Sequence, residues 1–91
     1  MNIIEELYAV IEDRKANPVD GSYTNYLMSQ GIDKIVKKVG EEAVETAIAA
    51  AHNSKEDTAN EIADVTYHLL VLMVQMGITL EDMEAVLRNR R

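Results

Sequence analysis

Five acidic residues are spaced so that helical segments would bring their carboxylates together. Glu42 and Glu45 form an E-x-x-E pair that Glu41 directly precedes, and Glu61 and Asp64 form an E-x-x-D pair. Residues three or four positions apart are neighbours on a helix surface. Carboxylate oxygens are the ligands that Mg²⁺ and Mn²⁺ prefer, and Mg²⁺ typically joins protein carboxylates to substrate phosphates. The spacing therefore predicts a divalent-cation site suited to phosphate chemistry.

Ordinary surface charge is the alternative explanation for the first group. Lys37 and Lys38 stand four residues before Glu41 and Glu42, so i,i+4 ion pairs on an exposed helix face explain these glutamates equally well. If the carboxylates do hold a cation, the same two lysines are placed to contact phosphate oxygens as point charges.

Surface charge explains the second group less well. Glu61 and Asp64 begin an apolar segment, and no Lys or Arg between residues 56 and 87 is available to pair with them. His68 continues their stripe along the helix. We interpret His68 as a buried histidine bonded to a backbone carbonyl rather than as a catalytic group.

Helical periodicity covers almost the whole chain, and no segment alternates apolar and polar residues as a half-buried strand does. Caps and stops divide the pattern, with Ser54 and Thr79 as N-caps and Gly31 and Gly77 as C-terminal stops. The expected helices cover residues 2–15, 22–30, 33–52, 55–76 and 80 to the basic end. This pattern predicts an all-α fold.

The two long helices should form an antiparallel hairpin around a tight turn near residue 53. Glu45 lies eight residues before this turn and Glu61 eight after it. With a rise of about 1.5 Å per residue on both helices, the two side chains should lie at the same level. The hairpin thus predicts that the acidic pairs meet.

Apolar surface exceeds what a short chain can cover. The helix over 55–76 is apolar almost all round, and the helix over 33–52 has a second patch at Val44 and Ile48. The predicted core stripe of the helix over 33–52 consists of Ile32, Ile35, Val36, Val39, Ala43, Ala47 and Ala50. We expect a helical bundle assembled as a homodimer. The alternative is that the short second and fifth helices cover these surfaces.

Length, charge and composition limit the number of domains, the binding partners and the cellular location that we expect. The 91 residues suit one domain spanning 1–91, and the net charge of −7 disfavours binding to nucleic acid or to an anionic membrane. There is no cysteine for a disulfide, a thiolate nucleophile or a Cys-type zinc site. The amino terminus lacks the features of a signal peptide, and the apolar run over 65–80 is short for a membrane span. We expect a cytoplasmic protein.

Several segments carry a specific family pattern from one end of the chain to the other. They are Ser22-Tyr23-Thr24, Lys38-Val39-Gly40-Glu41-Glu42-Ala43-Val44-Glu45, Asn60-Glu61, Tyr67-His68-Leu69-Leu70-Val71-Leu72 and Leu87-Arg88. Together they resemble the phosphoribosyl-ATP pyrophosphohydrolase family, within the wider all-α nucleotide pyrophosphohydrolase superfamily. One departure is the Arg90-Arg91 end, where members of the family often have Arg-His.

The resemblance implies an Mg²⁺-dependent homodimer that converts phosphoribosyl-ATP to phosphoribosyl-AMP and pyrophosphate, the second step of histidine biosynthesis. By matching position it implies that the metal-binding and catalytic acids are Glu41, Glu42, Glu45, Glu61 and Asp64. It also implies that the residues contacting the substrate are Lys37, Lys38, Arg14, Ser22, Tyr23 and Thr24. Mn²⁺ is an alternative metal. The resemblance leaves open which acid is the general base and whether two subunits share a site.

Two other functions are compatible with parts of this sequence. A house-cleaning pyrophosphohydrolase for ordinary or damaged nucleoside triphosphates would share the acidic site, but the Ser22-Tyr23-Thr24 segment argues against it. A purely structural dimerisation module would have no use for an acidic pair at the start of an apolar helix.

Overall fold

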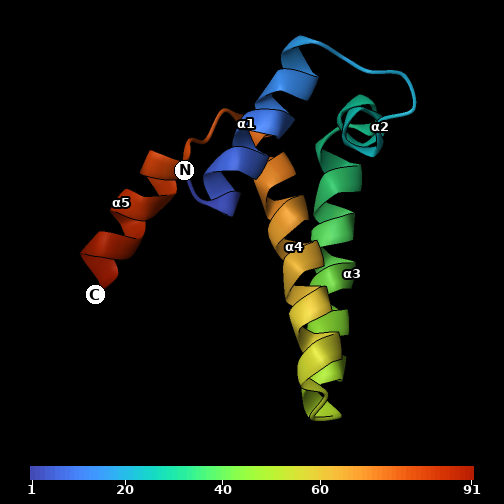
Figure 1. Ribbon diagram of the computed structural model, residues 1–91, viewed down its shortest axis with the longest axis vertical. Coiled ribbons are helices and arrows are strands. Elements are labelled where there is room, and N and C mark those ends of the chain that lie inside the picture. The colour runs from blue at the N-terminus through green and yellow to red at the C-terminus, as the bar shows by residue number, and fades with distance from the viewer.

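The computed structural model describes all residues from 1 to 91, and it contains helices and no strands (Figure 1). The helices are α1 (Ile3–Ala16), α2 (Tyr23–Gln30), α3 (Ile32–Ala51), α4 (Lys55–Met76) and α5 (Leu80–Arg90). The predicted all-α fold is confirmed, and the helix bounds agree closely with the predicted ones.

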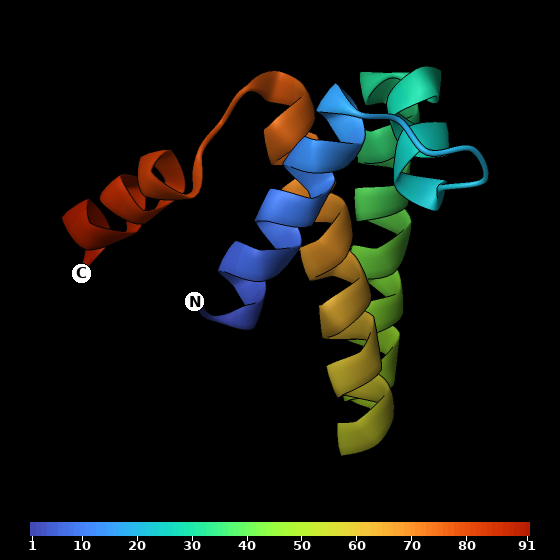
Figure 2. The same ribbon diagram turned by 45° about the horizontal axis from the view of Figure 1, so that its top comes forward.

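Helices α3 and α4 form the antiparallel hairpin around which the chain is built, and they lie side by side in Figures 1 and 2. In the turn between them, Asn53 has a left-handed φ of 57°, which asparagine tolerates better than most residues. Ser54 then caps α4, because its Oγ accepts a hydrogen bond from the backbone N–H of Asp57 at 3.2 Å. This tight, capped turn fixes the register of the two helices.

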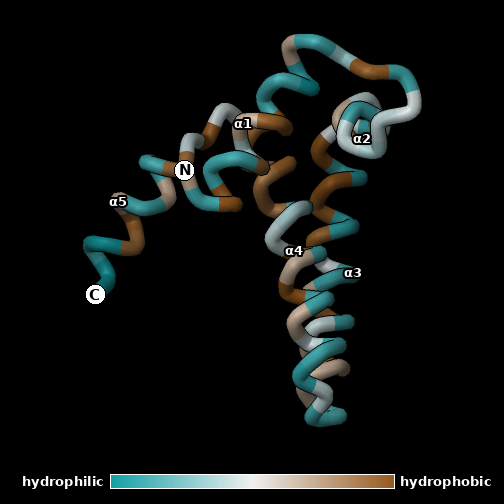
Figure 3. The backbone as a smooth tube through the Cα atoms, viewed as in Figure 1, coloured by the Kyte–Doolittle hydropathy of each residue, from teal (hydrophilic) through white to brown (hydrophobic).

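The apolar core lies toward the end of the hairpin away from the turn, where α1 and α2 pack against α3 and α4. Figure 3 shows hydrophobic residues gathered there and more hydrophilic residues toward the tip. The core consists of the buried side chains of Tyr8, Ile11, Leu27, Ile35, Leu70, Val71 and Val74. Tyr8 also donates a hydrogen bond from its hydroxyl to the carbonyl of Ile78 at 2.7 Å, which ties α1 to the segment after α4.

One asparagine holds α2 against the loop that leads into it. The side-chain amide of Asn25 donates to the carbonyl of Arg14 at 2.7 Å, and its oxygen accepts from the backbone N–H of Val19 at 2.9 Å. The helix then ends at Gly31, whose φ of 85° favours glycine and lets the chain turn directly into α3. These contacts place the beginning of α2 beside the end of α1.

The buried face of α3 differs from the predicted stripe. Ile35 is buried and Val39 half-buried, as expected, but the other members are exposed: Ile32, Val36, Ala43, Ala47 and Ala50. The face toward α4 instead includes Glu42, which is buried. Gly40 lies in the middle of α3, and no other part of the chain would come within 4 Å of a Cβ at this position. A tight crossing with another helix of this chain therefore does not explain the glycine. The predicted stripe was wrong in most of its members because the seam with α4 takes in a glutamate, which apolar periodicity does not predict; the second apolar patch, Val44 and Ile48, is exposed as well.

Helix α5 extends away from the other helices and buries none of its residues (Figures 1 and 2). The apolar surface of α4 therefore remains partly open, with Ile62, Leu69 and Met76 each more than 40% exposed. No single helix is long and apolar enough to cross a bilayer. Only α4 and α5 taken together meet the length and composition of a span, and they are bent by 113° relative to each other.

Candidate metal and substrate site

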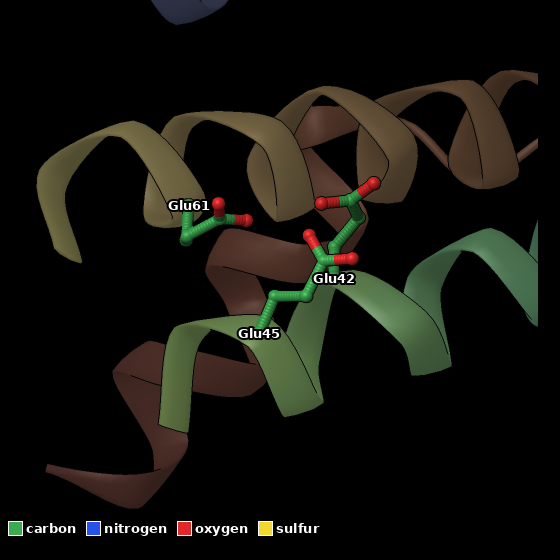
Figure 4. Close-up of side chains that lie close together, drawn as sticks. All are labelled: Glu42, Glu45 and Glu61. Carbon is green, nitrogen blue, oxygen red and sulfur yellow. The ribbon is translucent and has the colours of Figure 1, made fainter. Parts of the chain in front are cut away.

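Three of the predicted acids meet in the seam between the long helices. Glu42 and Glu45 extend from α3 and Glu61 from α4, and their carboxylates face one another across the hairpin (Figure 4). One oxygen from each of the three lies within 4.8 Å of the other two. The tight turn produces this convergence, because it places residues equally distant from it at the same level. The level predicted for Glu45 and Glu61 is therefore confirmed.

Two oxygens of this cluster are shielded from solvent and have no hydrogen-bond partner: Oε2 of Glu42 and Oε2 of Glu61. The other oxygen of Glu42, Oε1, lies 3.6 Å from Nζ of Lys38 one turn earlier on α3. Unpaired, buried carboxylate oxygens are unfavourable. Lys38 neutralises one negative charge of the cluster, and the cluster therefore keeps an excess of negative charge.

The crowding of carboxylates acts on the pKa of Glu61. Its burial raises its pKa from 4.5 to about 7, and contact with Glu45 and the negative charges of Glu42 and Asp64 act in the same direction. Below this pKa, the proton that Glu61 retains reduces the negative charge of the cluster, as a bound cation would. Like charges that share a site raise one another's pKa in this way.

The residues present fit a divalent cation of the Mg²⁺ or Mn²⁺ type. All three candidate ligands are carboxylates, two of their oxygens lack partners, and they converge from two rigid helices. Oxygen-only ligands suit these hard cations, whereas a zinc site would draw on histidine or cysteine. The one buried histidine, His68, has both ring nitrogens engaged with other groups.

The remaining two acids and Lys37 lie outside the three-carboxylate cluster. Glu41 is exposed and lines an open surface depression of α3 together with Lys37, Gly40 and Val44. Asp64 is also exposed, one turn after Glu61, and its charge contributes to the raised pKa of that residue. A metal-binding role for Glu41 and Asp64 stays a prediction.

The segment Ser22-Tyr23-Thr24 begins α2, and each of its three hydroxyls already has a partner within the chain. Ser22 Oγ accepts from the backbone N–H of Asn25 at 3.2 Å and caps the helix. The Tyr23 hydroxyl lies 3.0 Å from Nε2 of His68, and the Thr24 hydroxyl bonds the hydroxyl of Tyr67. Direct contact of these hydroxyls with a substrate stays a prediction.

His68 is the buried histidine that the sequence predicted. It is 5% exposed, and its Nδ1 lies 2.7 Å from the backbone carbonyl of Asp64. Tyr67 and Asn25 both organise the segment around residues 22–24, although neither was predicted to have a role. Tyr67 stands inside a family segment, which was a usable signal. Asn25 offered none, because its partners are backbone groups 6 and 11 residues earlier in the chain, and no helical spacing indicates them.

The structure thus defines a class: an all-α protein with a cation-type carboxylate site in the seam of a helical hairpin. The family model described as phosphoribosyl-ATP pyrophosphohydrolase matches residues 4–91. A phosphoribosyl-ATP pyrophosphatase of Clostridium acetobutylicum is 59% identical over 88 residues, which cover 97% of this chain and 80% of that protein. One of Streptococcus thermophilus is 56% identical over 89 residues, with 98% and 86% covered.

A longer relative shows the same segment within a larger protein. The histidine biosynthesis bifunctional protein HisIE of Caldanaerobacter subterraneus subsp. tengcongensis is 52% identical over 90 residues, which cover 99% of this chain and 44% of that protein. The chain belongs to the phosphoribosyl-ATP pyrophosphohydrolase family and is therefore an enzyme. The resemblance noted in the sequence is confirmed.

Proposed function

We propose that this enzyme hydrolyses the α–β phosphate bond of phosphoribosyl-ATP, with Mg²⁺ as cofactor and Mn²⁺ as a substitute. One water is consumed, and the products are phosphoribosyl-AMP and pyrophosphate, the second step of histidine biosynthesis. The observation that carries the proposal is the convergence of Glu42, Glu45 and Glu61 in a member of this family, with two carboxylate oxygens left without a partner.

Each group of side chains has a distinct task. Glu42, Glu45 and Glu61 hold the cation, with Asp64 and Glu41 as the further predicted ligands. When bound, a divalent cation neutralises charge on phosphate oxygens and makes a coordinated water more acidic. Lys38, beside Glu42, places its ammonium group next to the same seam, where it contacts the polyphosphate; Lys37 has the same predicted role from the exposed side of α3. Arg14 and the Ser22-Tyr23-Thr24 segment form the predicted substrate side.

We also propose that the enzyme works as a homodimer in the cytoplasm. Only nine of the 91 residues are buried, and apolar side chains such as Val44 and Ile48 on α3 are more than half exposed. A groove of about 500 Å³ between α4 and α5 is lined almost entirely by apolar side chains, including Leu69, Met73 and Leu87. A second copy is the occupant that a helical chain with so little buried surface needs.

The test is pyrophosphate release with Mg²⁺, from phosphoribosyl-ATP, ATP and dUTP in parallel. We expect release from phosphoribosyl-ATP, its loss with EDTA, and a decrease of more than about 100-fold in Glu61→Gln, because a metal ligand contributes several kcal/mol to the transition state. Circular dichroism checks that the variant is folded, and light scattering measures the mass of the assembly.

Each outcome separates one part of the proposal from the others. Release mainly from ATP or dUTP would keep the site but replace the substrate with an ordinary nucleotide. No release from any of the three, by a folded helical protein, would leave a structural dimerisation module. A monomeric mass at concentrations where the enzyme is active would contradict the dimer alone.

A further inference from the structure

Both ring nitrogens of His68 are occupied, which determines where its proton lies. Nδ1 lies 2.7 Å from the carbonyl oxygen of Asp64, and a carbonyl only accepts, so Nδ1 donates. In the neutral ring Nε2 is then an acceptor, and the Tyr23 hydroxyl 3.0 Å away donates to it. Burial raises the pKa of Tyr23, so its hydroxyl keeps the proton that it donates. The result is a directed chain of hydrogen bonds from Tyr23 through His68 to the backbone of Asp64.

A second contact runs parallel to the first. Thr24, next to Tyr23 on α2, bonds through its hydroxyl to Tyr67, next to His68 on α4. The rings also pack against one another: Tyr23 stacks on Tyr67 with centroids 6.1 Å apart, and it meets His68 edge to face with centroids 5.8 Å apart. Two consecutive residues of one helix are thus fastened to two consecutive residues of the other.

Helix α2 needs such a fastening. It has eight residues, fewer than an isolated helix requires for stability in water, so its position depends on tertiary contacts. Its first turn is the predicted substrate side, whereas Glu61 and Asp64 lie on α4. The hydrogen bond between Tyr23 and His68 connects these two parts of the site.

We propose that Tyr23 and His68 are positioning residues: their hydrogen bond sets the start of α2 against the Asp64 turn of α4. The Tyr23 hydroxyl acts through His68 rather than as a direct ligand of the substrate. The inference rests on the proposed function for its catalytic consequence, and on the hydrogen bonds alone for its structural one.

The catalytic test compares four variants at saturating Mg²⁺, well below their unfolding temperatures. Tyr23→Phe removes only the hydroxyl, and His68→Asn keeps a donor near the Asp64 carbonyl but does not reach Tyr23. We expect each to lower kcat/KM about five-fold, the equivalent of one neutral hydrogen bond. The double variant should lose no more than either single one, and His68→Gln, which reaches Tyr23, should recover part of the activity.

Tyr26→Phe is the matched control. Tyr26 lies on the same helix, its ring is 6.2 Å from that of Tyr23, and its hydroxyl makes no hydrogen bond within the chain. It should keep the wild-type kcat/KM. Losses in Tyr23→Phe and His68→Asn that multiply in the double variant, or full activity in Tyr23→Phe, would overturn the proposal.

Hydrogen exchange separates this inference from the proposed function, because it requires no activity. The backbone amides of α2 should exchange faster in Tyr23→Phe than in Tyr26→Phe. If the wild type releases no pyrophosphate, faster exchange still supports the positioning contact while the proposed function fails. Equal exchange in the two variants overturns the positioning contact whatever the activity.

Discussion

The two faces of α3 invert the usual distribution of side chains. Toward α4, the helix buries Glu42 to 7% exposure, with Lys38 and Glu45 beside it. On the opposite side, Val44 and Ile48 are more than half exposed. A buried carboxylate is costly unless a charge or a ligand compensates it, and exposed apolar side chains contribute nothing to the core. Neither face is explained by the stability of one chain; the inner face suits a cation and the outer face suits a partner.

The largest expected effect separates two adjacent glutamates. Glu42→Gln removes a charge from the cluster, so we expect activity on phosphoribosyl-ATP to decrease more than about 100-fold. Glu41 is a predicted ligand outside the three-carboxylate cluster and on the exposed side of α3, so Glu41→Gln should cost at least about ten-fold less. Steady-state kinetics at saturating Mg²⁺ measures both. Equal losses would show that the functional face of α3 extends to Glu41.

A smaller effect compares two isoleucines on α3. Ile35 is fully buried, so Ile35→Ala should lower the free energy of unfolding by about 2–5 kcal/mol, measured by urea denaturation. Ile48 is 53% exposed, so Ile48→Ala should cost much less in dilute protein, with any further loss depending on protein concentration. A large, concentration-independent loss in Ile48→Ala would place this side chain in the core of a single chain.

The smallest effect concerns the pH dependence of the metal-free protein. The folded chain keeps a proton on Glu61 up to a pKa of about 7, whereas the unfolded chain releases it near 4.5. The folded state therefore binds more protons between these values, so this contribution is complete below the unfolded pKa and is lost as pH rises through the folded one. With EDTA present, the unfolding midpoint of the wild type should decrease relative to that of Glu61→Gln as the pH rises from about 5 to about 8. A constant difference would contradict the raised pKa.

Local signals predicted the helices well, because each boundary depends on nearby residues. Ser54 and Thr79 accept hydrogen bonds from the N–H groups three residues later, and Gly31 and Gly77 take positive φ, as their types indicated. The meeting of Glu45 and Glu61 also followed from the sequence, since a short turn leaves little freedom in the register of a hairpin.

Tertiary choices were harder to predict. Two faces of α3 carry apolar residues, so the pattern did not reveal that the seam would take Glu42 and leave Val36 exposed. The contacts of Asn25 and Tyr8 join a side chain to a distant backbone carbonyl, which no spacing in the sequence encodes. Partner choice for polar side chains therefore had to come from the structure.

Direct titration of the metal-free protein with Mn²⁺, followed by electron paramagnetic resonance of the free ion, tests the carboxylate cluster without reference to any substrate. Wild-type protein should remove Mn²⁺ from solution, Mg²⁺ should compete for it, and Glu61→Gln should bind it at least about ten-fold more weakly while remaining helical. Equal binding by the wild type and the folded variant would contradict a cation site at Glu42, Glu45 and Glu61.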